Sequence, residues 1–218
     1  MTFDSRSVYQ LRKIYLLKKK EIVSRLREFE RCWTDKTDEE IFIELSFCIL
    51  TPQSRAKFCW DAITSLRKEN LLLKGNVARI REKLHCVRFH NKKAQYVVDA
   101  RRLFMGNDGI SIKALLDKFS DVYERREWLV KNIKGLGYKE ASHFLRNIGF
   151  GKDIAILDRH ILKNLNLLGV IKEIPESMGR KKYLGIEKNM AEFAKEIDIP
   201  LAHLDLLLWY KETGEIFK

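Results

Sequence analysis

The stretch IKGLGYKEASHFLRNIG, residues 133–149, determines how the rest of the chain is interpreted. Gly135 and Gly137 flank a single leucine, and apolar side chains follow at Ala141, Phe144, Leu145 and Ile148. That spacing places the four side chains on one face of an α-helix. A similar apolar face precedes the glycines, at Val122, Leu129 and Ile133. The sequence therefore predicts a helix, a tight turn and a second helix, with Lys139 in the first turn of the second helix.

Helical periodicity continues through most of the chain. Residues 39–50 and 56–66 carry apolar side chains three or four positions apart, and no segment shows the alternation of a half-buried strand. Only three prolines interrupt the 218 residues, at positions 52, 175 and 200. We therefore expect an all-α protein of roughly ten to twelve helices.

Capping residues mark several of the expected helix boundaries. Thr51 is interpreted as an N-cap, with Pro52 at the first helical position. Gly149 is expected to end the helix that follows the glycine turn. Asp158 precedes RHILKNLNLL and is interpreted as the N-cap of that helix.

The charge of the chain favours a polyanionic partner. Lysine and arginine number 42 against 30 acidic residues, which gives a formal net charge of +12. Such an excess suits nucleic acid or an anionic membrane surface, although a protein can also be basic without either partner. No apolar run approaches the roughly 18 residues of a membrane span. The first residues lack the apolar core of a signal peptide, so we expect a cytoplasmic protein.

The cysteines do not suggest a metal or a disulfide framework. Cys32, Cys48, Cys59 and Cys86 form no CxxC pair, and three of them fall on apolar faces. Reduced thiols in the core are the expected reading. The cluster of His85, Cys86 and His90 fits no zinc-ligand spacing, so we expect no metal and no cofactor.

The Gly-x-Gly turn offers a site for a phosphate group. Glycine allows positive φ angles and has no Cβ to obstruct an approaching strand. Backbone N–H groups of the turn and of the next helix start can then bind an anion, and such contacts position a duplex without reading its sequence. By itself the turn is more often an ordinary connection between antiparallel helices. An aspartate 19 positions after Lys139 adds a second group with possible chemistry.

The combination resembles a known superfamily. GLGYKEASHFLRNIG followed by ILDRHILKNL resembles the helix-hairpin-helix DNA glycosylases, and LSFCILTPQSRA, VRFHNKKAQYV and the final lysine are similar to the type 2 branch of 8-oxoguanine DNA glycosylases. The resemblance spans about residue 37 to the end of the chain. It implies an endonuclease III-like fold with two helical lobes flanking a DNA-binding cleft. One lobe is expected at residues 37–151, and the other would join 1–36 to 152–218.

The resemblance also implies an activity. A bifunctional enzyme of this kind excises 8-oxoguanine from double-stranded DNA through a lysine Schiff base and then cleaves the strand by β-elimination. We expect such an enzyme to act as a monomer at the nucleoid of a prokaryotic cell. The iron–sulfur cluster of endonuclease III cannot form, because no cysteine follows Cys86. This absence agrees with the type 2 branch.

Lys139 and Asp158 have the side chains that this chemistry needs. An amine can attack C1′ of the sugar as the base leaves, and lysine is the side chain for that covalent step. The start of a helix and an enclosed pocket both disfavour the ammonium form. Adjacent helical residues point about 100° apart, so we expect Glu140 to face away from Lys139. Asp158 could stabilise a cationic sugar, or it could only cap its helix.

Two histidines near these residues are weaker candidates. His160 lies at a helix start, where packing or solvent contact is more common than catalysis, and we leave it out of the catalytic set. His143 lies four residues after Lys139 and should share its helix face. It could support the active-site pocket or simply belong to the core.

Three residues are candidates for insertion into DNA. Gln53 in LTPQS matches the segment of the family that enters the duplex near the lesion, although it could also be a solvated glutamine. Arg88 could contact the base left without a partner. Phe89, which lies among four cationic or imidazole side chains, could act as a wedge or could anchor its own loop. Extrusion of a base costs a few kcal/mol, which such contacts offset.

The last residues could recognise the base. The resemblance associates the final lysine, Lys218, with the distinction between 8-oxoguanine and guanine. The oxidised base gains an N7–H donor and an oxygen at C8, which a carboxylate and an ammonium can bind. Trp209 could line the base pocket by stacking, or it could belong to the core. Alternatives to the whole reading are a glycosylase for another lesion and a non-catalytic DNA-binding hairpin module.

Overall fold

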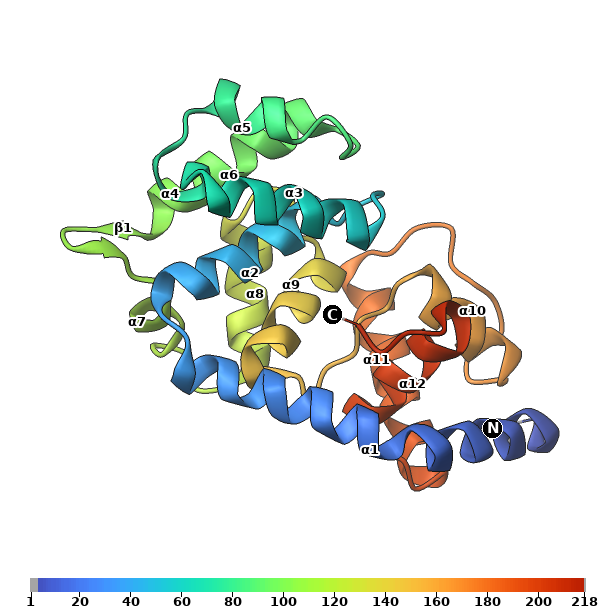
Figure 1. The fold of residues 1–218 in the computed structure, drawn as a ribbon. Coiled ribbons are helices and arrows are strands. Elements are labelled where there is room, and N and C mark those ends of the chain that lie inside the picture. The colour runs from blue at the N-terminus through green and yellow to red at the C-terminus, as the bar shows by residue number, and fades with distance from the viewer. Residues whose placement is uncertain (1–3, 218) are drawn as a thin grey trace. The chain divides into compact units, whose positions relative to one another are not determined.

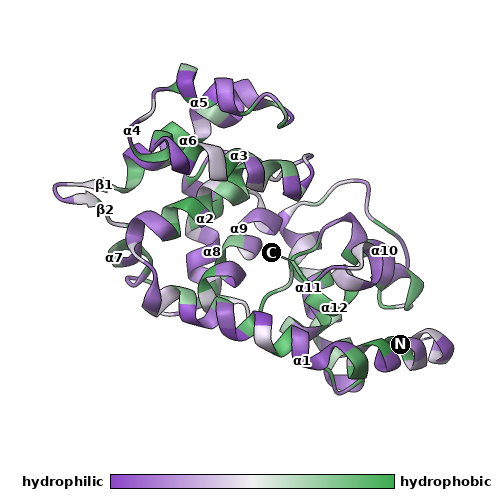
Figure 2. Ribbon diagram, in the orientation of Figure 1, coloured by the Kyte–Doolittle hydropathy of each residue, from purple (hydrophilic) through white to green (hydrophobic). Residues whose placement is uncertain are grey.

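The computed structural model describes residues 4–217 and is largely helical (Figure 1). Within these residues the chain forms twelve α-helices, one π-helical turn and one two-stranded sheet. The expected all-α fold is therefore confirmed. None of the described helices has both the length and the apolar character needed to cross a bilayer. Helix α1 (Ser5–Asp35) is the longest at 31 residues, and most of it is hydrophilic (Figure 2).

The chain divides into two compact units, the first of which is continuous from Cys32 to Ile148. It holds eight helices: α2 (Asp38–Leu50), α3 (Ala56–Lys68), α4 (Leu71–Lys74), α5 (Val77–Lys83), α6 (His90–Phe104), α7 (Ile112–Leu116), α8 (Val122–Asn132) and α9 (Tyr138–Leu145). Helix α2 packs against α3, α6 and α9. Nine of its 13 residues are buried, Ile41, Phe42, Leu45 and Phe47 among them. Each large apolar side chain buried in this way contributes roughly 1.5–3 kcal/mol to folding.

The second unit joins the chain up to Arg31 with the chain from Gly149 onward. It contains most of α1 together with α10 (Arg159–Leu167), α11 (Arg180–Glu196) and α12 (Leu201–Thr213), and α12 packs against both α10 and α11. The predicted boundaries were residues 37 and 151, whereas the structure divides the chain at Cys32 and Gly149. The first boundary falls inside the continuous helix α1, so no turn residue marks it in the sequence.

The connection between α2 and α3 differs from the prediction. Thr51 does not start a helix: it ends α2 with αR angles, and its hydroxyl donates to the carbonyl of Cys48 at 2.9 Å. Helix α3 begins only at Ala56, after a turn in which Gln53 has φ 54°. The prediction was wrong because a threonine hydroxyl can bond the preceding turn of a helix as readily as it caps the next one.

A short β-hairpin was also not predicted. Strand β1 (Met105–Gly106) pairs antiparallel with β2 (Gly109–Ile110), with Met105 opposite Ile110. Two-residue strands are too short to show an alternating pattern, so the sequence carried no strand signal there. Chain reversal occurs at Asn107 and Asp108, which are residue types that favour turns.

Candidate active site

The turn between α8 and α9 requires glycine at one of its two glycine positions. Gly135 has φ 89°, and a Cβ there would lie 2.7 Å from Cδ2 of Tyr96. Both the backbone angle and the close ring explain why no larger residue fits. Gly137 instead has φ −90° and ψ −175°, which any residue can adopt, and it precedes α9 as its N-cap. The expected positive φ therefore applies to Gly135 only.

Lys139 lies in the first turn of α9 and is paired with Glu140. The Nζ of Lys139 is 3.4 Å from Oε1 of Glu140, and the two side chains are 26% and 13% exposed. The expectation that Glu140 faces away from Lys139 was wrong. The second carboxylate oxygen accepts a hydrogen bond from the backbone N–H of Gly137 at 3.2 Å. This capping contact brings the carboxylate back over the helix start, where the flexible lysine side chain meets it.

A cysteine thiol close to this pair is not a competing nucleophile. Cys59 is fully buried, and its Sγ donates to the carbonyl of Leu50 at 3.2 Å. Burial raises the pKa of the Cys59 thiol to about 11, although the nearby ammonium groups of Lys93 and Lys139 partly oppose that rise. Since thiolate rather than thiol is the reactive form, Cys59 is unreactive at neutral pH.

Two of the predicted DNA-contacting residues of the first unit, Phe89 and Gly135, line one cavity. Gln53 and Arg88 are exposed, and the Phe89 side chain is 49% exposed. Phe89 is the N-cap of α6 with φ 60°, and the Arg88 guanidinium lies 5.1 Å from the centre of its ring. A cavity of about 210 Å³ is lined by Ile49, Pro52, Phe89, Lys92, Lys93, Tyr96 and Gly135. The structure thus brings the Pro52–Gln53 turn, Phe89 and the glycine turn together within one unit.

Asp158 caps α10, as the sequence predicted. Its Oδ1 accepts hydrogen bonds from the backbone N–H groups of His160 and Ile161, both at 2.8 Å. Such bonds fix the orientation of the carboxylate. Lys139 belongs to the first unit and Asp158 to the second.

The extended segment before Asp158 is held by buried polar side chains. The backbone N–H of Ala155 donates to Glu187 at 2.9 Å, and that of Ile156 donates to Asp205 at 2.9 Å. The Tyr183 hydroxyl donates to the carbonyl of Ala155 at 2.6 Å. Because Ile154, Ala155, Ile156 and Leu157 are buried, their backbone groups need such partners in place of water. These contacts fix the position of the backbone that leads to Asp158.

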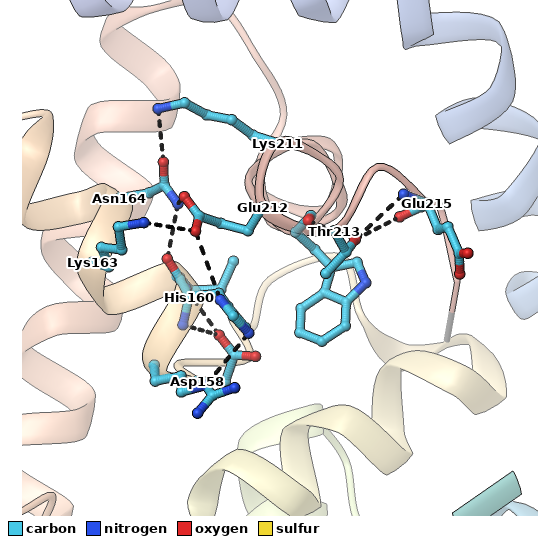
Figure 3. A network of polar contacts seen from close by, with 11 residues as sticks. Asp158, His160, Lys163, Asn164, Lys211, Glu212, Thr213 and Glu215 are labelled. Atoms are coloured by element: carbon cyan, nitrogen blue, oxygen red, sulfur yellow. Dashed lines mark hydrogen bonds and ion pairs between the residues drawn. The ribbon is translucent and has the colours of Figure 1, made fainter. Parts of the chain in front are cut away.

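The helix that follows Asp158 is fixed to α12 by a polar network (Figure 3). Lys163 donates to Glu212 at 2.9 Å, and Asn164 donates to the other oxygen of the same carboxylate at 3.0 Å. The Lys163 hydrogen bond is the main reason that the pKa of Glu212 lies below its ordinary value. Lys211 completes the network by donating to Asn164 at 2.8 Å. Glu212 therefore stays ionised and ties α10 to α12.

His160 and Trp209 lie together in this network. Their rings meet edge to face with centres 5.4 Å apart, and His160 Nδ1 is 3.8 Å from Glu212. The indole N–H of Trp209 is buried and makes no hydrogen bond to any described residue. A buried donor without a partner normally costs about 1–3 kcal/mol, which makes this indole a candidate contact for a ligand. Lys218, the other predicted base-recognition residue, lies outside the described residues.

His143 belongs to the core, and two polar residues near the cavity, Lys93 and Ser54, were not predicted from the sequence. His143 is only 6% exposed and packs edge to face against Phe47 with ring centres 5.6 Å apart, which favours its core reading. Lys93 and Ser54 were missed. The sequence feature that could have indicated Lys93 is its position on the face of α6 that also carries the buried residues Ala94 and Val97. A charged residue in such a stripe needs partners, and these only the tertiary structure shows.

Comparison with known proteins identifies relatives along nearly the whole chain. Residues 22–199 match a family model described as 8-oxoguanine DNA glycosylase. The chain is 49% identical over 209 residues to 8-oxoguanine DNA glycosylase/AP lyase of Fusobacterium nucleatum, covering 96% of each protein. It is 41% identical over 221 residues to the protein of the same name from Methanocaldococcus jannaschii, covering 95% of this chain and 99% of the relative.

Solved structures agree with the sequence matches. The Methanocaldococcus jannaschii 8-oxoguanine glycosylase/lyase in complex with a 15mer DNA containing 8-oxoguanine superposes with a TM-score of 0.85 at 39% identity, covering 96% of this chain and all of that one. The 8-oxoguanine DNA glycosylase of Thermotoga maritima superposes with a TM-score of 0.82 at 35% identity, covering 97% and 98%. The fold, the glycine turn followed by Lys139 and these matches together show that the chain belongs to the 8-oxoguanine DNA glycosylase family.

Proposed function

We propose that this protein excises 8-oxoguanine from double-stranded DNA and cleaves the strand at the resulting abasic site. The observation that carries the proposal is Lys139, which lies at the start of α9 directly after the glycine turn, in a chain 49% identical to an 8-oxoguanine DNA glycosylase/AP lyase. Bacterial and archaeal relatives support action at the nucleoid of a prokaryotic cell. A hairpin module that only grips DNA would have no use for this lysine.

Lys139 acts as the nucleophile in the proposed reaction. Its ammonium must first lose a proton, and the Glu140 carboxylate at 3.4 Å is an acceptor within reach. The neutral amine then attacks C1′, the bond between C1′ and the base breaks, and its electron pair leaves with the base, which is protonated by solvent. One proton of Nζ passes to O4′ as the C1′–O4′ bond breaks, and the opened sugar is left as a protonated Schiff base between Nζ and C1′. Removal of a proton from C2′ then expels the 3′ phosphate by β-elimination.

Asp158 has an electrostatic role in this proposal. Positive charge develops on the sugar as the base leaves, and an ionised carboxylate stabilises such a transition state. The two backbone hydrogen bonds fix the carboxylate through Oδ1 and do not involve its second oxygen. Its fixed orientation avoids a reorganisation cost during the reaction.

The remaining predicted residues bind the DNA or the base. The glycine turn of Gly135 and Gly137 receives a backbone phosphate, and Gln53, Arg88 and Phe89 occupy the space that the extruded nucleotide leaves. The exposure of these last three side chains supports that assignment. Trp209 and Lys218 contact the extruded base. For Trp209 the supporting observation is its buried indole N–H, which has no partner among the described residues.

Trapping of the covalent intermediate tests the proposal. The protein is incubated with a duplex containing one 8-oxoguanine and with sodium borohydride, which reduces a Schiff base to a stable amine. Wild type should form an adduct of protein with DNA, whereas Lys139→Gln should form none because an amide cannot make the Schiff base. Lys68→Gln, at an exposed lysine on α3, is the matched control and should trap like wild type.

The same experiment has clear contrary outcomes. An adduct of normal yield with Lys139→Gln would show that another amine is the nucleophile. If wild type forms no adduct and leaves the 8-oxoguanine in the duplex, the proposal that the protein excises 8-oxoguanine would be wrong. An undamaged duplex and a preformed abasic site in parallel reactions separate base removal from strand cleavage.

A further inference from the structure

Lys93 is a charged side chain in the interior of the first unit. It lies in the first turn of α6 and is only 3% exposed. Its Nζ donates to the carbonyl of Leu50 at 2.7 Å, to the carbonyl of Pro52 at 2.7 Å and to the Ser54 hydroxyl at 3.0 Å. An ammonium carries three hydrogens, so all of its donors are used. Lys93 therefore has neither exposure nor a free hydrogen for a contact with DNA.

Two of the three acceptors of Lys93, Pro52 and Ser54, belong to the connection between α2 and α3, and the third, Leu50, is the last residue of α2. We call residues 51–55 of this connection the Gln53 turn, and residues 85–89 before α6 the Phe89 segment. Ser54 links the Gln53 turn to the Phe89 segment, because its Oγ accepts a hydrogen bond from Lys93 and another from the backbone N–H of Arg88 at 3.1 Å. A continuous chain of hydrogen bonds thus runs from α6 through the Gln53 turn to the Phe89 segment.

Both linked stretches contain a residue in a costly backbone conformation. Gln53 has φ 54° and Phe89 has φ 60°, in the left-handed region that residues other than glycine rarely adopt. Such a conformation is energetically unfavourable and persists only where surrounding contacts impose it. For the Gln53 turn, the bonds from Lys93 on either side of Gln53, to Pro52 and Ser54, are contacts of this kind.

Burial of this lysine is costly in itself. Desolvation lowers the pKa of Lys93 to about 8 from its ordinary value of 10.5. Nearby positive charge on Lys139 and Arg88 acts in the same direction, while the Glu140 carboxylate opposes it. An apolar side chain of similar length would avoid this cost but would take the ammonium donor away from three acceptors. The Leu50 carbonyl would keep only the Cys59 thiol as a donor, and the Pro52 carbonyl only the Ser54 hydroxyl at 3.5 Å. The energetic cost points to a requirement for these three hydrogen bonds.

We propose that Lys93 is a positioning residue that holds the Gln53 turn and the Phe89 segment as one preorganised unit for insertion into DNA. The inference deepens the proposed function and rests on it, since insertion is needed only where a base is extruded. A preformed arrangement removes the entropy cost of ordering two stretches at the moment of binding. Misplacement of residues away from the chemistry can lower a rate by roughly 100-fold.

The inference predicts a difference between the two reactions of the enzyme. Extrusion of a paired 8-oxoguanine depends on side chains that fill the vacated stack, whereas a preformed abasic site has no base to extrude. Loss of Lys93 should therefore slow base removal more than it slows strand cleavage at an abasic site. A purely structural role would lower both rates together, because it would reduce the amount of folded enzyme.

Single-turnover rates on two duplexes test this difference. One duplex contains 8-oxoguanine and the other a preformed abasic site. With Lys93→Met, base removal should fall by roughly 10- to 100-fold while abasic-site cleavage changes by less than about threefold. Ser54→Ala keeps both carbonyl bonds of Lys93 and removes the hydroxyl that accepts from Lys93 and from Arg88, so its loss should be smaller, up to about tenfold. Lys68→Met controls for loss of one positive charge from the same unit.

Hydrogen exchange provides a second readout that is independent of activity. In Lys93→Met the backbone amides of the Gln53 turn and of the Phe89 segment should both exchange faster, while those of α2 should not change. Ser54→Ala should speed exchange at Arg88 and leave the fold intact. If Lys93→Met does not fold, the Ser54→Ala rates and exchange decide the question.

The contrary results are specific. Equal losses in both reactions, or unchanged exchange in the two stretches of a folded variant, would overturn the inference. If the wild-type protein removes no base, the proposed function fails, and hydrogen exchange then decides by itself whether Lys93 holds the two stretches together.

Discussion

Asp158 has a structural role that must be separated from any catalytic one. Its Oδ1 accepts the two backbone N–H groups that begin α10, and this cap alone would account for an aspartate at the position. Asparagine caps a helix about as well as aspartate, because its amide oxygen accepts the same bonds. Substitution by asparagine therefore removes the charge and keeps the cap, whereas alanine removes both.

For these two variants of Asp158 we predict the same loss of activity but different stabilities. Asp158→Asn should keep the free energy of unfolding within about 0.5 kcal/mol of wild type, and Asp158→Ala should lower it by about 1 kcal/mol. If the carboxylate stabilises the cationic sugar, both variants should lose base removal by roughly 100-fold or more. Thermal unfolding and single-turnover rates measure the two effects. A fully active Asp158→Asn would show that Asp158 only caps α10 and has no electrostatic role in the reaction.

Glu140 shows how a single contact changes the expected chemistry of Lys139. The sequence argument used the angle between adjacent helical residues and concluded that the two side chains diverge. Instead the Glu140 carboxylate turns back to the N–H of Gly137 and lies 3.4 Å from Lys139. The Lys139 ammonium must therefore leave this ion pair or transfer its proton before the amine can attack.

Among the elements, the turn between α8 and α9 places strict demands on its first glycine. Gly135 combines φ 89° with a Tyr96 ring atom 2.7 Å from the position of a Cβ. Tyr96 lies on α6 and lines the same cavity as Phe89 and Gly135. Helix α6 therefore contacts both the glycine turn, through Tyr96, and the Gln53 turn, through Lys93.

Two glycine substitutions should have opposite signs. Gly135→Ala should lower the free energy of unfolding by about 1–3 kcal/mol, because it forces an alanine into a left-handed conformation and displaces the ring. Gly185→Ala, inside α11 with no atom within 4 Å of the new Cβ, should raise it by about 0.5–1 kcal/mol. Denaturant unfolding measures both. A neutral Gly135→Ala would mean that the turn adapts at little cost.

For the whole molecule, the net charge of +12 governs how it approaches DNA. Lysines and arginines near phosphates release counterions on binding, and this contribution does not depend on the base sequence. It supplies affinity for any duplex, while the extruded base supplies the difference between damaged and undamaged DNA. These two contributions respond differently to salt.

Affinity should therefore depend on salt with the same slope for both duplexes. We expect the logarithm of the binding constant to fall linearly with the logarithm of salt concentration, with a loss of roughly 10³-fold between 50 and 200 mM if about six phosphates are contacted. A duplex with 8-oxoguanine should bind more tightly by a constant factor. Fluorescence titration with Lys139→Gln avoids turnover during the measurement. Salt-independent affinity would contradict binding through phosphates.

The helical class, the glycine turn, the cap at Asp158 and the family followed from the sequence alone. These features are local: they depend on periodicity over a few turns, on the φ angle of one glycine and on residues that cap the helix they begin. Short motifs such as GLGYKEASHF carry that information in consecutive residues. No contact between distant parts of the chain was needed to read them.

Only the tertiary structure decided which side chains pair across the chain. Thr51 bonds backward into α2 because the turn after it diverges from a helical path at Gln53. Lys93 is more than 35 residues from each of its three acceptors, at sequence separations of 43, 41 and 39. Its buried position becomes favourable only once α2 and α6 have packed together. Burial and long-range hydrogen bonds arise from packing, so they cannot be read from a pattern of neighbouring residues.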